Sequence, residues 1–458
     1  MSVGLVLAGV GMLLLILTAF DPLRGGGVLA ACTVLELAGA GYYWRNRGRL
    51  VWLDVPGRIV TRTPEDLNDD ARPRLKLHPY FGYVSRPGQV LAQVSDLLGY
   101  QRDMGLADRP DWWDRTFSNN HGLFGEQNFP VMKTDTRQFI VGIFGGSVAA
   151  AFALEERGGI AQVVRGVPGY EDRDVLVLDL AMGGFHQPVQ LFVLNYMLTL
   201  GQTFDLIINL DGFNEAFCGW DNAENFKTHV SMPNAWFIFG QQNEFVSKRS
   251  YGNTRAILAA RARLRRIENE MLGARSALHF YALRLIWELI QRRATQIESD
   301  YSKPHPDRDY PVYLLPQERV GLRDVAQEIA NIWARSIFQT KAIADLIGAP
   351  FIEMLQPSQY YGPRVFSEEE RRVAFVDPPF YGAGIVPDAY DAMRGYAGEF
   401  ASRGIRFVDT TAAFDNYTGH FYHDAVCHIN RRGMDVILNE LLAHQIRDAL
   451  QTSRGSRG

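Results

Sequence analysis

The chain has 458 residues, of which 47% are hydrophobic and 21% charged, a composition typical of folded proteins rather than disordered or fibrous ones. Lys and Arg together number 47 and Asp and Glu 51, so the formal net charge is −4. That balance gives no electrostatic reason to expect a nucleic-acid partner. Three widely spaced cysteines are too few for a disulfide framework or for a zinc site of the CxxC type.

Two apolar runs lie at the start of the chain. Residues 3–20 contain no charged side chain, and residues 28–44 contain only Glu36. A membrane-spanning helix needs about 17–25 mainly apolar residues, so we expect residues 1–45 to form a transmembrane hairpin of two helices. A single anchor is one alternative. A cleaved signal peptide is another, although the first residues lack the basic side chain that such a peptide carries.

The orientation of the hairpin is predicted from the basic residues that flank it. Arg45, Arg47 and Arg49 follow the second run directly, whereas the connector between the runs holds only Arg24. The positive-inside rule then places the large C-terminal part on the cytoplasmic side of the cell membrane. If only one segment spans the membrane, the same part lies on the periplasmic or extracellular side.

Residues 46–134 and 135–458 differ in character. The first range is rich in Pro, Gly, Trp and Tyr and predicts loops and short strands. In the second, short apolar runs alternate with segments of helix length, as in strands buried on both faces of a sheet. Five such strands joined by helices predict a three-layer α/β/α fold with a doubly wound parallel sheet. The runs are Phe139 to Phe144, Val175 to Leu180, Leu206 to Leu210, Pro350 to Leu355 and Ile405 to Val408.

The interval between the third and fourth runs is much longer than one crossover needs. It predicts a helical insertion at about residues 223–345, with helical stretches over residues 255–296 and 317–346. Apolar residues in the first stretch recur at spacings of three, four or seven, which indicates one apolar face. They are Ile257, Leu264, Ile267, Met271, Leu278, Tyr281 and Leu285. Glutamates are interspersed with the arginines of this stretch, which favours a solvated face, with contact to a membrane surface or to nucleic acid as the alternatives.

A serine follows the first predicted strand at a strand-to-helix turn. The strand stops at Gly145 and Gly146, Ser147 follows, and a helix-forming run begins at Ala149. At the carboxyl edge of a parallel sheet, the Ser147 N–H and the helix N-terminus can stabilise an oxyanion. The turn lacks the lysine of a phosphate loop and the second glycine of a G-x-S-x-G elbow. A helix-capping serine is the non-catalytic alternative.

The C-terminal part and the third strand contribute further polar residues. Asp424 precedes His428 just before a helix-forming stretch, so one loop could supply both a base and the acid that orients it. His423 is the alternative base. Asn214 follows the third strand, where its amide could serve as an oxyanion donor. Cys427 and Cys218 lie beside these motifs and are expected to be buried small side chains.

These residues together resemble the SGNH hydrolase superfamily, also called GDSL lipases or esterases. Gly145-Gly146-Ser147 is similar to block I of that family, with glycine in place of the aspartate that precedes the serine. Asp211-Gly212-Phe213-Asn214-Glu215 is similar to block III, and Asn214 matches its asparagine. His428 matches the block V base. The resemblance covers about residues 135–220 and 350–450.

Two departures from the family pattern leave assignments open. Asp424 lies four residues before His428, where the family spacing is three, so either the loop carries an extra residue or another acid orients the histidine. In block II, Ala181 stands at the position of the family's glycine, and Gly183 is the alternative donor. His186 and Gln187, which follow this turn, are expected to be loop residues.

The resemblance implies a membrane-anchored serine hydrolase or acyltransferase with a Ser147–His428–Asp424 triad. The oxyanion hole would comprise the N–H groups of Ser147 and of Ala181 or Gly183, together with the Asn214 amide. No metal or organic cofactor is implied, and no HExxH or GxGxxG motif occurs. The expected partners are an ester-bearing saccharide or lipid and the membrane lipid. The alternative is a non-catalytic binding or assembly subunit of a membrane complex.

Overall fold

The computed structural model describes residues 75–91, 116–234, 248–273, 277–302, 321–375 and 382–455. The chain divides into two compact units, and the described part of the smaller one lies between residues 247 and 303. None of the described helices is long and apolar enough to cross a membrane. The transmembrane hairpin predicted over residues 1–45 lies outside the described residues.

The larger unit is built on a sheet of five parallel strands in the order β4-β3-β5-β6-β7. This confirms the predicted α/β fold with a parallel sheet of about five strands. Each strand begins and ends within one residue of the apolar run that predicted it, because the strands are buried by helices on both faces. The strands are β3 (Gln138–Gly145), β4 (Asp174–Asp179), β5 (Leu206–Asp211), β6 (Phe351–Leu355) and β7 (Arg406–Asp409).

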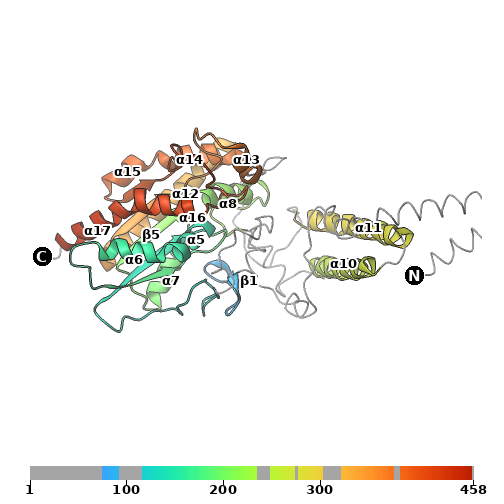
Figure 1. Cartoon of the computed structure of the whole chain (residues 1–458), viewed down its shortest axis with the longest axis horizontal. Helices are drawn as coiled ribbons and strands as arrows, with labels where there is room; N and C mark the ends of the chain where they lie inside the picture. Colours follow the sequence, from blue (N-terminus) through green and yellow to red (C-terminus); the bar gives the residue numbers. More distant parts are fainter. Residues whose placement is uncertain are drawn as a thin grey trace, which may run out of the picture. The chain divides into compact units, whose positions relative to one another are not determined.

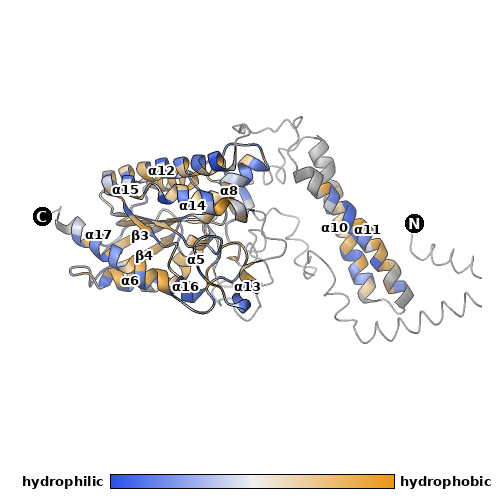
Figure 2. Cartoon of the chain, turned by 90° about the horizontal axis from the view of Figure 1, so that it is seen from above, coloured by the Kyte–Doolittle hydropathy of each residue, from blue (hydrophilic) through white to orange (hydrophobic). Residues whose placement is uncertain are grey.

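Helices cover both faces of this sheet, which gives three layers (Figure 1). In Figure 2, α12 and α14 lie on one side of the strands and α6 and α16 on the other. The first layer contains α7 (Val189–Thr199), α8 (Phe213–Glu224), α12 (Leu322–Ile347) and α14 (Val386–Arg394). The second contains α5 (Ser147–Glu155), α6 (Arg157–Arg165), α16 (Arg431–Val436) and α17 (Ala443–Gly455). Short helices α13 (Glu368–Ala374) and α15 (Ala397–Ser402) lie between β6 and β7 in the chain.

A small hairpin precedes the sheet in the chain. Strands β1 (Leu75–His78) and β2 (Gly82–Ser85) pair in antiparallel fashion, in the range for which the sequence predicts loops and short strands. Phe81 and Tyr83 are buried and belong to the same hydrophobic core as the residues of the five-stranded sheet. The hairpin is therefore part of the larger unit.

The predicted helical stretch over residues 255–296 is two helices. Helix α10 (Lys248–Leu272) and helix α11 (Ala277–Ser302) pack side by side around their own core of Leu264, Met271, Phe280, Leu283 and Trp287. The prediction that Leu285 belongs to the apolar face is wrong, since its side chain is 60% exposed. Each helix buries the face that packs against the other helix. Apolar spacings counted as if the two helices were one continuous helix do not predict these faces. Helix α12, also within the predicted insertion, packs in the larger unit.

Candidate active site

Two chemical groups named from the sequence lie at the carboxyl edge of the sheet. Ser147 is the first residue of α5, directly after β3, and Asn214 lies in the first turn of α8, directly after β5. Strand β3 has β4 on one side and β5 on the other, so the chain changes its direction of winding there. Ligands of open parallel sheets bind in the crevice at such a switch point.

Ser147, His428 and Asp424 form one hydrogen-bonded chain. The distance between His428 Nε2 and Ser147 Oγ is 2.8 Å, and His428 Nδ1 bonds to Asp424 Oδ2. All three side chains are buried. An ionised carboxylate only accepts hydrogen bonds, so Nδ1 carries the proton and Nε2 is left to accept the Ser147 hydroxyl proton. The arrangement is that of a serine nucleophile with its base and orienting acid.

Asp424 is ionised although its side chain is buried. Burial by itself would raise the pKa of this carboxyl, but the charge and hydrogen bond of His428 outweigh it, with smaller contributions from the His423 charge and the Val426 N–H. The net effect holds the pKa of Asp424 below its ordinary value. Asp424 is therefore ionised over the whole neutral range, as an acid that orients and stabilises an imidazolium must be.

The loop between Asp424 and His428 accommodates the spacing of four residues. Asp424 Oδ1 accepts the backbone N–H groups of Val426, Cys427 and His428 at 2.9, 3.1 and 3.1 Å. Cys427 has a φ of 146°, a left-handed backbone conformation that side chains other than glycine rarely adopt. This turn takes up the extra residue, and Asp424 itself is the acid that contacts the histidine. The Cys427 and Cys218 side chains are buried, as expected.

The Asn214 amide lies over the glycine that precedes the serine. A Cβ atom at Gly146 would come within 2.0 Å of Asn214 Nδ2. Nδ2 donates one of its two hydrogens to the Phe185 carbonyl at 3.0 Å. The structure thus brings the predicted oxyanion donor next to the predicted nucleophile, with its amide nitrogen directed at the turn after β4.

The turn after β4 distinguishes between the two predicted block II donors. The Ala181 N–H donates to Asp179 Oδ1 at 2.9 Å, so a carboxylate already occupies it. The Gly183 carbonyl accepts the Tyr83 hydroxyl at 2.7 Å, which ties this turn to the β1–β2 hairpin. Of the two residues, Gly183 is the better candidate for the oxyanion donor. Tyr83 is a support of the site that sequence reasoning missed, because no local signal pairs it with a turn 100 residues away.

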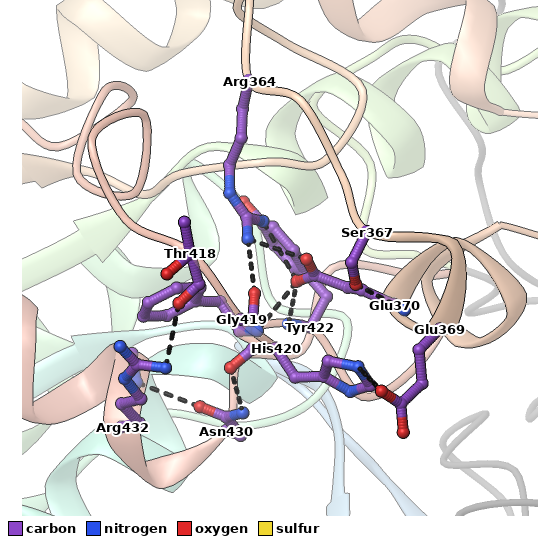
Figure 3. A network of polar contacts seen from close by, with 12 residues as sticks. Arg364, Ser367, Glu369, Glu370, Thr418, Gly419, His420, Tyr422, Asn430 and Arg432 are labelled. Carbon is purple, nitrogen blue, oxygen red and sulfur yellow. Dashed lines mark hydrogen bonds and ion pairs between the residues drawn. The ribbon is translucent and has the colours of Figure 1, made fainter.

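A buried ion pair holds the segment that leads into the loop from Asp424 to His428 (Figure 3). Arg364 contacts both carboxylate oxygens of Glu370, at 3.0 and 2.7 Å, and also donates to the Gly419 carbonyl at 2.8 Å. Glu370 Oε1 in turn accepts the N–H groups of Phe421 and Tyr422. The fully buried carboxylate therefore has its charge and its lone pairs satisfied, as burial of a charge requires.

Two side chains from the segment after β6 bond to the loop from Asp424 to His428 itself. Gln359 Nε2 donates to the Asp424 carbonyl at 3.1 Å, and the Tyr360 hydroxyl donates to the Ala425 carbonyl. Sequence reasoning did not identify these residues or Arg364 and Glu370. The order of the serine and histidine motifs is visible in the sequence. The contact of a buried side chain with a distant backbone group is not.

The remaining candidates take other positions. His423 lies with its ring centroid 5.9 Å from that of His428, and its backbone N–H donates to the His428 carbonyl. His428, not His423, makes the bond to Ser147 described above. His186 is buried with Nε2 at 3.2 Å from the Val230 carbonyl, and Gln187 Nε2 donates to Asp211. These two residues therefore bond to the protein interior.

A scan against protein-family models and a search of curated proteins both found no match to this chain. Within the described residues, no three His, Cys, Asp or Glu side chains are placed to hold a metal ion together.

Proposed function

We propose that this protein is an SGNH-type serine hydrolase or acyltransferase that acts on an ester. One observation carries the proposal: Ser147 Oγ lies 2.8 Å from His428 Nε2, although the two residues are 281 positions apart in the chain. The imidazole is held on its other side by a buried carboxylate. A serine that merely capped a helix would need no such base.

The reaction follows from the positions of these groups. Ser147 Oγ attacks the ester carbonyl while His428 Nε2 takes the hydroxyl proton, and Asp424 stabilises the imidazolium that forms. The negative charge on the carbonyl oxygen is stabilised by the N–H groups of Ser147 and Gly183 and by the Asn214 amide. His428 then protonates the leaving alcohol. Water or a second alcohol, activated by the same histidine, releases the acyl group from Ser147.

The order of the motifs supports the family assignment as a proposal. The serine, the asparagine and the acid–histidine pair follow the first strand, the third strand and the last strand of the parallel sheet, as in SGNH hydrolases. The substrate class we propose is an O-acylated saccharide or a lipid ester. We also propose that residues 1–45 anchor the protein in the cell membrane with the α/β domain on the cytoplasmic side, because apolar runs and flanking arginines occur there.

The test is labelling and turnover by the full-length protein. A fluorophosphonate probe should label the wild type at Ser147, and the purified protein should hydrolyse p-nitrophenyl acetate. We expect Ser147→Ala and His428→Ala each to lower kcat/KM by about 10³-fold or more. Ser336→Ala is the matched control, because Ser336 is also a buried serine and its described hydrogen bond is to the Ile332 carbonyl within α12.

Two outcomes would reject the hydrolase. Retention of most of the activity by Ser147→Ala would exclude the triad. A folded wild type that neither reacts with the probe nor turns over esters would favour the alternative, a non-catalytic subunit that keeps the fold for binding or assembly.

A further inference from the structure

Three carboxyl groups lie buried beneath the turns that carry the proposed oxyanion donors. Asp211, Glu215 and Glu353 are each no more than 2% exposed. Amide and indole groups donate to them: Asp211 accepts from Gln187, Gln190, Asn209 and Trp333, and Glu353 accepts from Asn209. Burial of a carboxyl group is costly unless hydrogen bonds compensate for it, so each of the three needs a structural or functional reason.

Glu215 differs from the other two because it binds backbone groups of two separate turns. Its Oε2 accepts the Gly212 N–H at 2.6 Å, in the turn after β5. Its Oε1 accepts the Gln187 N–H at 3.1 Å, in the turn after β4. One side chain therefore joins the turn that precedes Asn214 to the turn that contains Gly183.

The neighbouring residue makes a parallel connection. Asn214, directly before Glu215, donates from Nδ2 to the Phe185 carbonyl of the same β4 turn. That bond occupies one of the two amide hydrogens and orients the other. The direction of that second hydrogen then depends on how far apart the two turns are, and Glu215 bonds to both of them.

The contact with Gly212 alone would be an ordinary helix cap. Gly212 is the N-cap residue of α8, and Glu215 is the third residue of that helix, the usual position for such a bond. The contact with Gln187 is not explained by capping, because Gln187 lies 28 residues away in another turn. A residue that only capped α8 would need no hydrogen bond to the turn after β4.

We propose that Glu215 is a positioning residue of the active site, which holds the turns after β4 and β5 at the separation that aims the Asn214 amide at the oxyanion. The inference rests on the proposed ester chemistry. Burial, followed by the charge of Asp211, raises the pKa of Glu215 well above its ordinary value. The protein thus keeps at this position a carboxyl group that is unfavourable to ionise, where an apolar residue would pack without that penalty.

Glu353 provides a matched control. It is equally buried, and burial and the Asp211 charge raise its pKa as they do for Glu215. Glu353 accepts its described hydrogen bond from Nδ2 of Asn209, and Asn209 lies in strand β5 and in neither turn. Replacing Glu353 therefore reproduces the loss of a buried acid without releasing the two turns.

The experiment compares steady-state hydrolysis of p-nitrophenyl acetate by full-length variants, with rates divided by the folded fraction from circular dichroism. We expect Glu215→Gln to lower kcat by about 10- to 100-fold with KM changed less than about threefold, because one of the two backbone contacts is lost. Glu215→Ala should lower kcat further. Glu353→Gln should leave kcat within about threefold of the wild type.

Equal effects of Glu215→Gln and Glu353→Gln on kcat, or a Glu215 effect on KM alone, would overturn the positioning role. If Glu215→Ala does not fold, Glu215→Gln and the shorter Glu215→Asp decide the question. Ser147→Ala, measured in parallel, separates the two proposals. If hydrolysis does not depend on Ser147, the proposed function fails and this inference with it; if it does depend on Ser147 and the Glu215 series is flat, only the positioning role fails.

Discussion

Gly146, the residue before Ser147, stands where the SGNH hydrolases that the chain resembles have an aspartate, and the packing around it leaves no room for a side chain. A side chain at that position would begin 2.0 Å from Asn214 Nδ2, so an aspartate there and the present position of Asn214 exclude each other. The glycine has a φ of −90°, which any residue can adopt. The position therefore requires the small size of glycine and not its backbone freedom.

This packing makes a prediction about Asn214. We expect Asn214→Ala to lower kcat by about 10²–10³-fold with little change in KM, because an oxyanion donor acts chiefly on the transition state. Gly146→Ala should give a similar loss, since its methyl group would displace the amide. The double variant should then be no worse than either single variant, which steady-state kinetics on the four proteins would check.

Gly158→Ala is the control for the glycine substitution. Gly158 lies in α6, and a Cβ atom there would meet no other atom within 4 Å. This variant should keep full activity and gain slightly in stability. Additive losses for Asn214→Ala and Gly146→Ala would mean that the two residues act separately, which would contradict the role assigned to the amide.

At the scale of elements, α5 and α16 both begin at the active site and come together again at a pair of carboxyl groups. Ser147 starts α5, and α16 begins three residues after His428. At the other end of α5, Glu156 lies beside Asp435 of α16. Burial and then the Asp435 charge raise the pKa of Glu156 to about 7.

This pair predicts a pH dependence of stability. In the unfolded chain Glu156 would titrate near its ordinary value of about 4.3. The folded state therefore binds the extra proton between about pH 4 and pH 7, and the stability it contributes is present below that range and is lost as the pH rises through 7. Between pH 5 and pH 8, we expect the free energy of unfolding of the wild type, measured in urea, to fall by about 1–2 kcal/mol more than that of Glu156→Gln.

Glu368→Gln is the control for this experiment, because that carboxylate is largely exposed on α13. Its stability curve should run parallel to that of the wild type over the same pH range. A Glu156→Gln curve that also ran parallel to the wild type would show that the carboxyl pair does not titrate in this range.

At the scale of the whole molecule, the two units have separate cores. Trp287 lies in the core of the α10–α11 pair, where its indole N–H donates to Glu268 at 2.8 Å. Trp333 lies in the core of the larger unit, where its indole N–H donates to Asp211 at 3.2 Å. Both tryptophans are buried, so they make a matched pair of substitutions.

We expect Trp287→Ala to destabilise the helical pair by about 3–5 kcal/mol while kcat and KM for the ester stay unchanged. Trp333→Ala should instead destabilise the α/β unit, which holds the triad. Thermal unfolding followed by circular dichroism, together with the ester assay, measures both. An equal loss of activity in the two variants would show that the helical pair takes part in the chemistry.

Much of the fold and of the candidate site was predictable because the relevant signals are local. A parallel strand buried on both faces must be a short apolar run, so β3 to β7 stand out in the sequence within one residue of their bounds. The carboxyl ends of such strands share one edge, which predicts that Ser147 and Asn214 are neighbours. The sequence also allows His428 to be proposed as the base, because an acid and a histidine lie close together in one loop.

Other features depended on contacts between residues far apart in the sequence. No spacing in the sequence encodes hydrogen-bond geometry. Only the structure shows that the Ala181 N–H is bonded to Asp179 and that Asp424 contacts His428 across an extra residue. The buried faces of α10 and α11 follow from the pairing of the two helices, because each buries the face that its partner covers. The buried acids Glu215 and Glu370 are stable only because the tertiary structure supplies their hydrogen-bond partners from distant parts of the chain, so the tertiary structure alone decided these contacts.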